Sequence, residues 1–303
     1  MPLRTYQIAL LFSLFVAPAL PAQHANNEWP VYTDVSAALA ANVPARQLSL
    51  RDRHLFSLPA GTEKLRQLTY LNLMRNELEV WDPQLTALRR LELLNLQENN
   101  LRELPESVGN LCRLKQLEVT QNRLKTLPDA VADLRQLAYL QAGFNELDRL
   151  PERLGRCRKL RVLNLQGNQL SRLPASLRRL HQLTHLDLSY NQLREVDLDW
   201  SGMKRLSKLN LEGNNLRRLP AAIGALSNLH TLILTGNELA ELPPQLTDLT
   251  ELKLLVLANN QLTLLPDDLS KLTNLRTLIL TGNPLPAAEI ERVRRALPNC
   301  RVR

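Results

Sequence analysis

Aromatic residues make up only 4% of this 303-residue sequence, although 44% of its residues are hydrophobic. A chain of this length and hydrophobicity is expected to fold around an ordered core. Because aromatic rings contribute little to that core, leucine must fill it. This bias indicates a repetitive interior, in which the same side chain occupies many equivalent positions.

Cysteine is also scarce, and Cys112, Cys157 and Cys300 are scattered along the chain. Three isolated cysteines do not provide the framework that holds together a small disulfide-rich domain. We therefore expect the fold to form without disulfides, even though an exported protein would meet an oxidising compartment.

Familiar catalytic motifs are missing. The sequence has no HExxH, no paired CxxC, no GxSxG and no phosphate-binding glycine loop, and no cluster of metal ligands stands out. We expect no cofactor and a protein that is not an enzyme. One pair of residues leaves a hydrolase as a hypothesis. His185 and Asp187 lie two residues apart on the same face of a predicted strand, although no third catalytic partner is evident.

Only one apolar stretch has the character of a targeting segment. Arg4 precedes an apolar run over residues 8–16, and small residues follow in "APALPA". This pattern predicts an export signal over residues 1–22, cleaved after Ala22, and a mature chain without a transmembrane segment, in the periplasm or secreted. A membrane anchor is the alternative, but the run is short for spanning a bilayer.

The dominant feature is a repeat of 23 residues without insertions. The ten regular copies follow the pattern LxxLxLxxNxL, as in "LRVLNLQGNQL" over residues 160–170, and only Val119 and Ala142 replace a leucine of the pattern. An imperfect copy precedes them at residues 45–55. The repeated asparagines are Asn76, Asn99, Asn122, Asn145, Asn168, Asn191, Asn214, Asn237, Asn260 and Asn283.

Each copy predicts one short strand and one return segment. Alternation of leucine with polar residues predicts a half-buried strand, and strands entered from the same side every 23 residues build a parallel sheet. The return half, such as "LPERLGRCRKL" over residues 150–160, is too short for a long helix, and its proline favours a tight turn. The asparagine amide is expected to bond buried backbone groups where strand and return meet.

This pattern closely resembles the leucine-rich repeat proteins, in particular the 23-residue class found in bacterial exported members and in relatives of Ras suppressors. The resemblance implies an α/β repeat solenoid: a curved right-handed horseshoe with a parallel sheet on its concave face, short turns or 3-10 segments on the convex face, and helical caps. It divides the chain into a linker and capping helix at 23–44, repeats at 45–285 and a closing cap at 286–303. Val35 and Leu39 are expected on the buried side of the first helix, and Ile290, Val293 and Leu297 on that of the last.

The concave wall is the expected binding surface, because its strands are ordered before a partner arrives. Aromatic anchors on a rigid wall are typical of protein-binding hot spots, although surface aromatics without a role are the alternative. The residues that we expect on this wall are Tyr139, Phe144, His185, Asp187 and Tyr190. An apolar end of the wall, containing Ile233 and Val256, either receives a partner or only stabilises the stacked strands.

Positive charge gathers on one flank of the middle coils, where Arg158, Lys159, Lys204 and Arg205 precede strands. Such a flank would attract an acidic protein, an anionic glycan or an envelope component, or it would only keep the protein soluble. The sparse aromatics between these charges argue against nucleic acid. The sequence thus predicts an exported, non-enzymatic protein-binding scaffold, with charge-led glycan binding as the alternative.

Overall fold

The computed structural model describes residue 26 and residues 28–303. The predicted export signal, residues 1–22, lies outside the described residues. Among the residues described, no helix is both long and apolar enough to cross a membrane.

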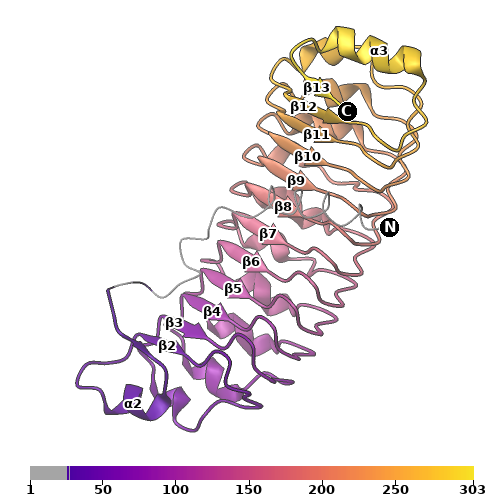
Figure 1. The fold of residues 1–303 in the computed structure, drawn as a ribbon. Coiled ribbons are helices and arrows are strands. Elements are labelled where there is room, and N and C mark those ends of the chain that lie inside the picture. Colours follow the sequence, from indigo (N-terminus) through magenta and orange to yellow (C-terminus); the bar gives the residue numbers. More distant parts are fainter. Residues whose placement is uncertain (1–25, 27) are drawn as a thin grey trace.

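Over this described part, thirteen short strands form one parallel sheet in which strands adjacent in sequence are adjacent in space (Figure 1). The strands are β1 (Val31–Tyr32), β2 (Gln47–Ser49), β3 (Tyr70–Asn72), β4 (Leu93–Asn95), β5 (Gln116–Glu118), β6 (Tyr139–Gln141), β7 (Val162–Asn164), β8 (His185–Asp187), β9 (Lys208–Asn210), β10 (Thr231–Ile233), β11 (Leu254–Val256), β12 (Thr277–Ile279) and β13 (Arg301–Val302). Leu163 pairs with Leu140 on one side and Leu186 on the other, so the 23-residue period of the sequence is the register of the sheet.

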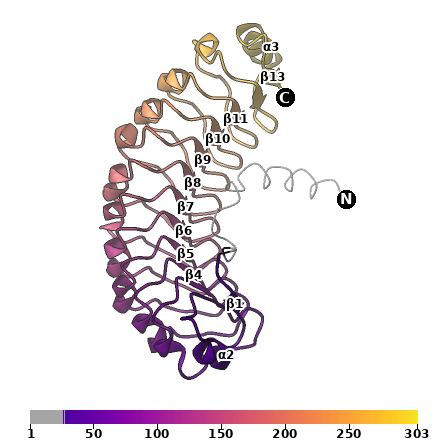
Figure 2. The same cartoon turned by 90° about the vertical axis from the view of Figure 1, so that its left-hand side faces the viewer.

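Between residues 28 and 303, ten 3-10 helices carry the chain back along the opposite side of the solenoid. Figure 2 shows these helices on the outer side of a curve whose inner side is formed by the strands. They are η1 (Thr62–Lys64), η2 (Pro83–Ala87), η3 (Glu106–Asn110), η4 (Asp129–Asp133), η5 (Leu154–Arg156), η6 (Ala175–Arg179), η7 (Trp200–Gly202), η8 (Ala221–Ala225), η9 (Pro244–Asp248) and η10 (Leu269–Lys271). Several begin after a proline such as Pro128, whose φ of −69° suits this turn. Asp82 replaces that proline at η2 and accepts a hydrogen bond from the Gln84 N–H instead.

One continuous core fills the space between strands and 3-10 helices, and leucines such as Leu94 and Leu163 are fully buried in it. Cys157 occupies a leucine position and is also fully buried, and burial raises the pKa of its thiol to about 12. The thiol is therefore protonated and inert at neutral pH. The predicted fold class, a leucine-filled solenoid with a parallel sheet on its concave face, is confirmed.

The repeated asparagine performs the structural role that the sequence predicts. The Asn168 side chain accepts a hydrogen bond from Leu147 N–H at 3.0 Å and donates to the carbonyls of Ala142 at 3.0 Å and Leu165 at 2.9 Å. One amide thus joins its own coil to the preceding one. Because the Asn168 side chain is buried, water cannot take its place as the hydrogen-bond partner of these backbone groups.

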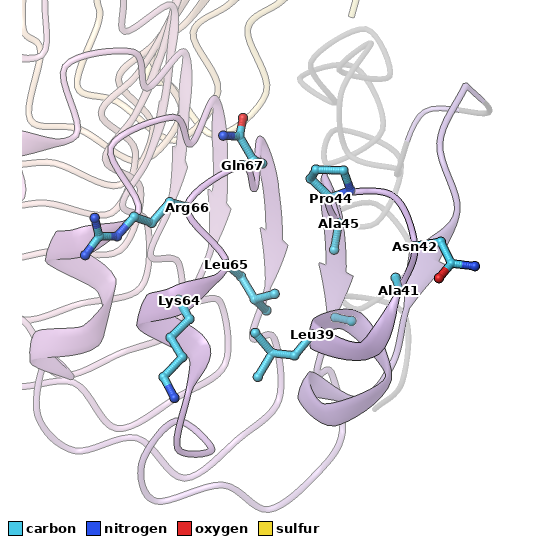
Figure 3. Close-up of a pocket in the computed structure, with 10 residues that line it drawn as sticks. Leu39, Ala41, Asn42, Pro44, Ala45, Lys64, Leu65, Arg66 and Gln67 are labelled. Atoms are coloured by element: carbon cyan, nitrogen blue, oxygen red, sulfur yellow. The ribbon is translucent and has the colours of Figure 1, made fainter.

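A short helix, α2 (Val35–Ala40), lies at the N-terminal end of the solenoid, and Asp34 accepts a hydrogen bond from Ala37 N–H at its start. Val35 and Ala38 are the buried residues of α2, whereas Leu39 is 43% exposed. The prediction that Leu39 lies on the buried side is therefore wrong. Leu39 instead lines a shallow cleft between α2 and η1, opposite Leu65 (Figure 3).

At the other end, α3 (Ala287–Ala296) packs on the last coil through Val293, which is fully buried, and Leu297 follows it into the core. Ile290 is half-buried. Glu289 is the unexpected buried residue of this helix: its carboxylate accepts from Leu265 N–H and lies 2.7 Å from the Arg292 guanidinium.

Candidate functional site

Two rows of side chains line the concave face of the sheet. Tyr139 and His185 begin strands β6 and β8, with Val162 between them in the ladder. The second row contains the last residue of each strand, which includes Asp187 in β8. Strands stacked about 4.8 Å apart let each side chain cover its neighbours.

The second row is more buried than the sequence suggests. Asp187 is only 8% exposed, and its carboxylate accepts hydrogen bonds from Ser189 N–H at 2.9 Å, from the Ser189 hydroxyl at 2.6 Å and from the Asn210 amide at 3.4 Å. Burial raises the pKa of Asp187, while these hydrogen bonds oppose the rise. The expectation of an accessible Asp187 is corrected: it is a partnered, buried residue within the sheet.

The apolar end of the wall is buried in the same way. Ile233 and Val256 are 1% exposed and form a small second cluster with Ala258, against which Leu254 and Ile279 pack. These β-branched side chains already cover one another. The arrangement favours the simpler alternative, in which they stabilise the stacked strands.

His185 and Asp187 do not form a catalytic pair in this structure. The Nδ1 atom of His185 lies 2.9 Å from the Thr184 hydroxyl, and no hydrogen bond or ion pair between described residues joins it to Asp187. Burial, and then the positive charge of Lys208, lowers the pKa of His185 to about 4. The imidazole is thus neutral at physiological pH and has no carboxylate to orient it, so the hydrolase hypothesis loses its geometric support.

His185 should therefore titrate far below the ordinary range of a histidine side chain. We expect an NMR titration of the ring protons to give a pKa near 4 for His185, against an ordinary value of 6.5. Because the folded pKa is the lower one, this group stabilises the fold above about pH 6.5, and its contribution declines as the pH falls towards 4. The variant His185→Gln assigns the resonance, and a measured value near 6.5 would contradict the burial described here.

Phe144 and Tyr190 form the exposed aromatic edge of this wall. Both occupy the left-handed turn that follows a strand, with φ of 52° and 54°, and are 45% and 39% exposed. Tyr190 donates its hydroxyl hydrogen to Glu212 at 2.9 Å. Their shared position, two coils apart, matches the sequence prediction.

A glycine in the next coil supports each ring. A Cβ atom at Gly167 would lie 2.8 Å from Phe144 Cδ1, and one at Gly213 would lie 2.6 Å from Tyr190 Cδ1. Each ring therefore occupies space that a side chain at the glycine position would fill. The sequence analysis overlooked these glycines, although their signal was present: each stands 23 residues after an aromatic residue.

The predicted basic residues lie apart from the aromatic edge. Arg158, Lys159, Lys204 and Arg205 are all exposed, in the tight turns that precede β7 and β9. Lys159 donates to the Gln136 side chain at 2.5 Å, and Arg205 donates to the Gln182 side chain. Within the described part of the chain, none of these four cations pairs with a carboxylate.

Comparison with solved structures places the fold among known repeat proteins. The chain is similar to the plant peptide hormone receptor RGFR1 in complex with RGF2, with a TM-score of 0.70 and 26% identity over 81% of this chain and 41% of the receptor chain. It is also similar to the functional domain of InlJ from Listeria monocytogenes, with a TM-score of 0.66 and 28% identity over 78% of this chain and 49% of that one. The chain thus matches less than half the length of either protein.

A chain of the octameric complex of Latrophilin 3, Unc5D and FLRT2 matches with a TM-score of 0.72 at 23% identity, over 84% of this chain and 82% of that one, which shows the fold alone. No curated protein matches the sequence. The family model described as "Leucine rich repeat" matches residues 89–147, 143–193, 158–216 and 227–285, which together make up more than half of the chain. With its 23-residue register, asparagine ladder and parallel sheet, the chain belongs to the leucine-rich repeat family.

Proposed function

We propose that this protein is an exported, non-enzymatic scaffold that binds a partner protein along its concave face, in the periplasm or outside the cell. The observation that carries the proposal is the exposed aromatic edge formed by Phe144 and Tyr190, whose rings rest on the glycines of the next coils. Rings held in this way lose little freedom on binding, so their apolar area contributes to affinity.

The rest of the wall supports the same function. Tyr139 is half-buried at the start of β6 and lies on the strand that leads into the Phe144 turn. His185 is neutral and half-buried two strands further on. The receptor RGFR1, to which the chain is similar, was solved in complex with RGF2, so a protein or peptide ligand suits this type of surface.

Removing the aromatic residues should strongly weaken recognition without unfolding the protein. We expect the purified protein to crosslink to a partner from envelope or culture-medium fractions, and the triple variant Tyr139→Ala, Phe144→Ala and Tyr190→Ala to lose it. In a direct titration with the identified partner, the triple variant should bind about 30-fold more weakly, the loss typical of a hot spot.

The matched control is Phe56→Ala, because Phe56 is 69% exposed and lies outside the aromatic edge. This variant should bind like the unchanged protein. Equal capture by the triple variant and the unchanged protein would disprove the aromatic edge as the recognition site. Circular dichroism of all variants confirms that the repeats remain folded.

A further inference from the structure

Each coil contains a two-residue turn between its 3-10 helix and the next strand. In the turn at residues 112–113, Leu114 N–H donates to the Leu111 carbonyl at 2.8 Å, and both leucines are fully buried. The two residues between them must therefore face solvent. The same pair of positions returns every 23 residues, which places these turns side by side along one flank of the solenoid.

Seven successive turns on this flank contain nine arginine or lysine residues and no aspartate or glutamate. We call these nine the basic stripe: Arg66, Arg89, Arg90, Arg113, Arg135, Arg158, Lys159, Lys204 and Arg205. All nine are exposed. The three turns that follow, at residues 227–228, 250–251 and 273–274, contain no arginine or lysine and one glutamate, so the stripe ends after Arg205.

Most charges of the stripe are not neutralised by carboxylates, and glutamines hold some of these cations in place. Arg90 donates to Gln67 at 2.5 Å and Lys159 donates to Gln136 at 2.5 Å, in each case to the same turn of the preceding coil. A glutamine amide fixes a cation but leaves its charge in place. Of the nine, only Arg135 lies near a carboxylate, with its guanidinium 3.7 Å from Asp133, among the residues that the structure describes.

The turns that follow the strands, on the opposite flank, are built differently. There several cations pair with carboxylates of adjacent coils, as the Arg102 guanidinium does with Glu79 at 3.2 Å and that of Arg218 with Glu195 at 3.4 Å. In the stripe, by contrast, neutral glutamines hold Arg90, Lys159 and Arg205. The basic stripe is therefore a specific arrangement of cations on one flank and does not simply follow from the net charge of +8.

We propose that the basic stripe binds a linear acidic polysaccharide, laid along the axis of the solenoid. Seven turns spaced by about 4.8 Å give a stripe about 30 Å long, which suits an extended polymer with regularly spaced negative charges. Gln67, Gln136 and Gln182 lie among the cations and offer hydrogen bonds to sugar hydroxyls. This site is separate from the aromatic edge and adds a second ligand to the proposed function.

The stripe favours a polysaccharide over nucleic acid. None of its fourteen turn positions is Phe, Tyr or Trp, and His181 is the only ring among them, so unpaired bases would find little to stack on. The N-terminal end of the stripe is Arg66, which lies beside the cleft that Leu39 and Leu65 line (Figure 3).

The test compares two variants that lose the same charge from opposite flanks. The stripe variant is Arg158→Gln, Lys159→Gln, Lys204→Gln and Arg205→Gln, and the control variant is Arg102→Gln, Arg172→Gln, Arg217→Gln and Arg218→Gln. Probes are heparin, polygalacturonate, neutral dextran and double-stranded DNA. At 0.15 M salt we expect heparin or polygalacturonate to bind, dextran not to bind, and the stripe variant to lose about 30-fold in affinity while the control loses less than about 3-fold.

A second measurement uses the unchanged protein and does not depend on how the variants fold. Cys112 is exposed in the third turn of the stripe, whereas Cys300 is half-buried at the far end of the chain. The bound polysaccharide should slow alkylation of Cys112 and leave that of Cys300 unchanged. Equal losses in both charge variants, tighter binding of DNA than of either acidic polysaccharide, or equal protection of the two thiols would overturn the proposal.

Discussion

The variant Asn168→Ala is expected to lower the free energy of unfolding by about 3–5 kcal/mol. The alanine would leave Leu147 N–H without a partner, and the carbonyls of Ala142 and Leu165 would each lose one of two asparagine donors, keeping only Asn145 and Asn191. These groups are buried between two coils, where water cannot replace the amide. The loss therefore exceeds the roughly 1 kcal/mol that an exposed hydrogen bond contributes.

Asn283→Ala is the matched control, because Asn283 forms the same bonds at the last position of the ladder. Its side chain accepts from Leu262 N–H at 3.1 Å and donates to the Leu257 and Leu280 carbonyls at 2.8 Å, but it is only half-buried. Urea unfolding followed by circular dichroism should show a clearly smaller loss for this variant. Losses equal within about 0.5 kcal/mol would mean that burial does not determine the contribution of the ladder.

Most of the fold could be predicted because the period of the sequence is the register of the sheet. Leucines recur every 23 residues at three strand positions, and only in-register stacking of the strands buries all of them. The structure has this stacking, since Leu163 pairs with Leu140 and Leu186. The buried face of α2 could not be predicted in this way. A six-residue helix has too few positions for a pattern, so packing on the first coil determined that Ala38 rather than Leu39 is buried.

The candidate site was harder to predict, because accessibility depends on neighbouring coils. Alternation placed Asp187 on the outward face, which is correct, but its burial results from Ser189 and Asn210. The extent of the basic stripe was missed for another reason. Neighbours in the sequence can lie on different flanks, so the carboxylates that follow Arg89 and Arg113 in the sequence hide the positive charge that these residues add to the stripe.

The variant Gly155→Ala should be as damaging, through a clash on the convex side. A Cβ atom at Gly155 would lie 1.9 Å from the backbone carbonyl oxygen of Ser176, which no side-chain movement can relieve. The two coils are also joined there, since Gly155 N–H donates to the Ser176 hydroxyl at 3.1 Å. We expect the free energy of unfolding to fall by about 3 kcal/mol, the upper end of the cost of overpacking.

Gly109→Ala controls for the general effect of adding a methyl group, because Gly109 holds the same position two coils earlier. Its Cβ would meet Ala130 at 3.1 Å, which a small adjustment accommodates. The stability of a repeat array includes the interfaces between neighbouring coils. Gly155→Ala weakens a central interface, so this variant, but not Gly109→Ala, should unfold in two steps. A single transition of unchanged midpoint would show that the 3-10 helices can move apart while the sheet holds, and that the curvature of the concave wall is adjustable.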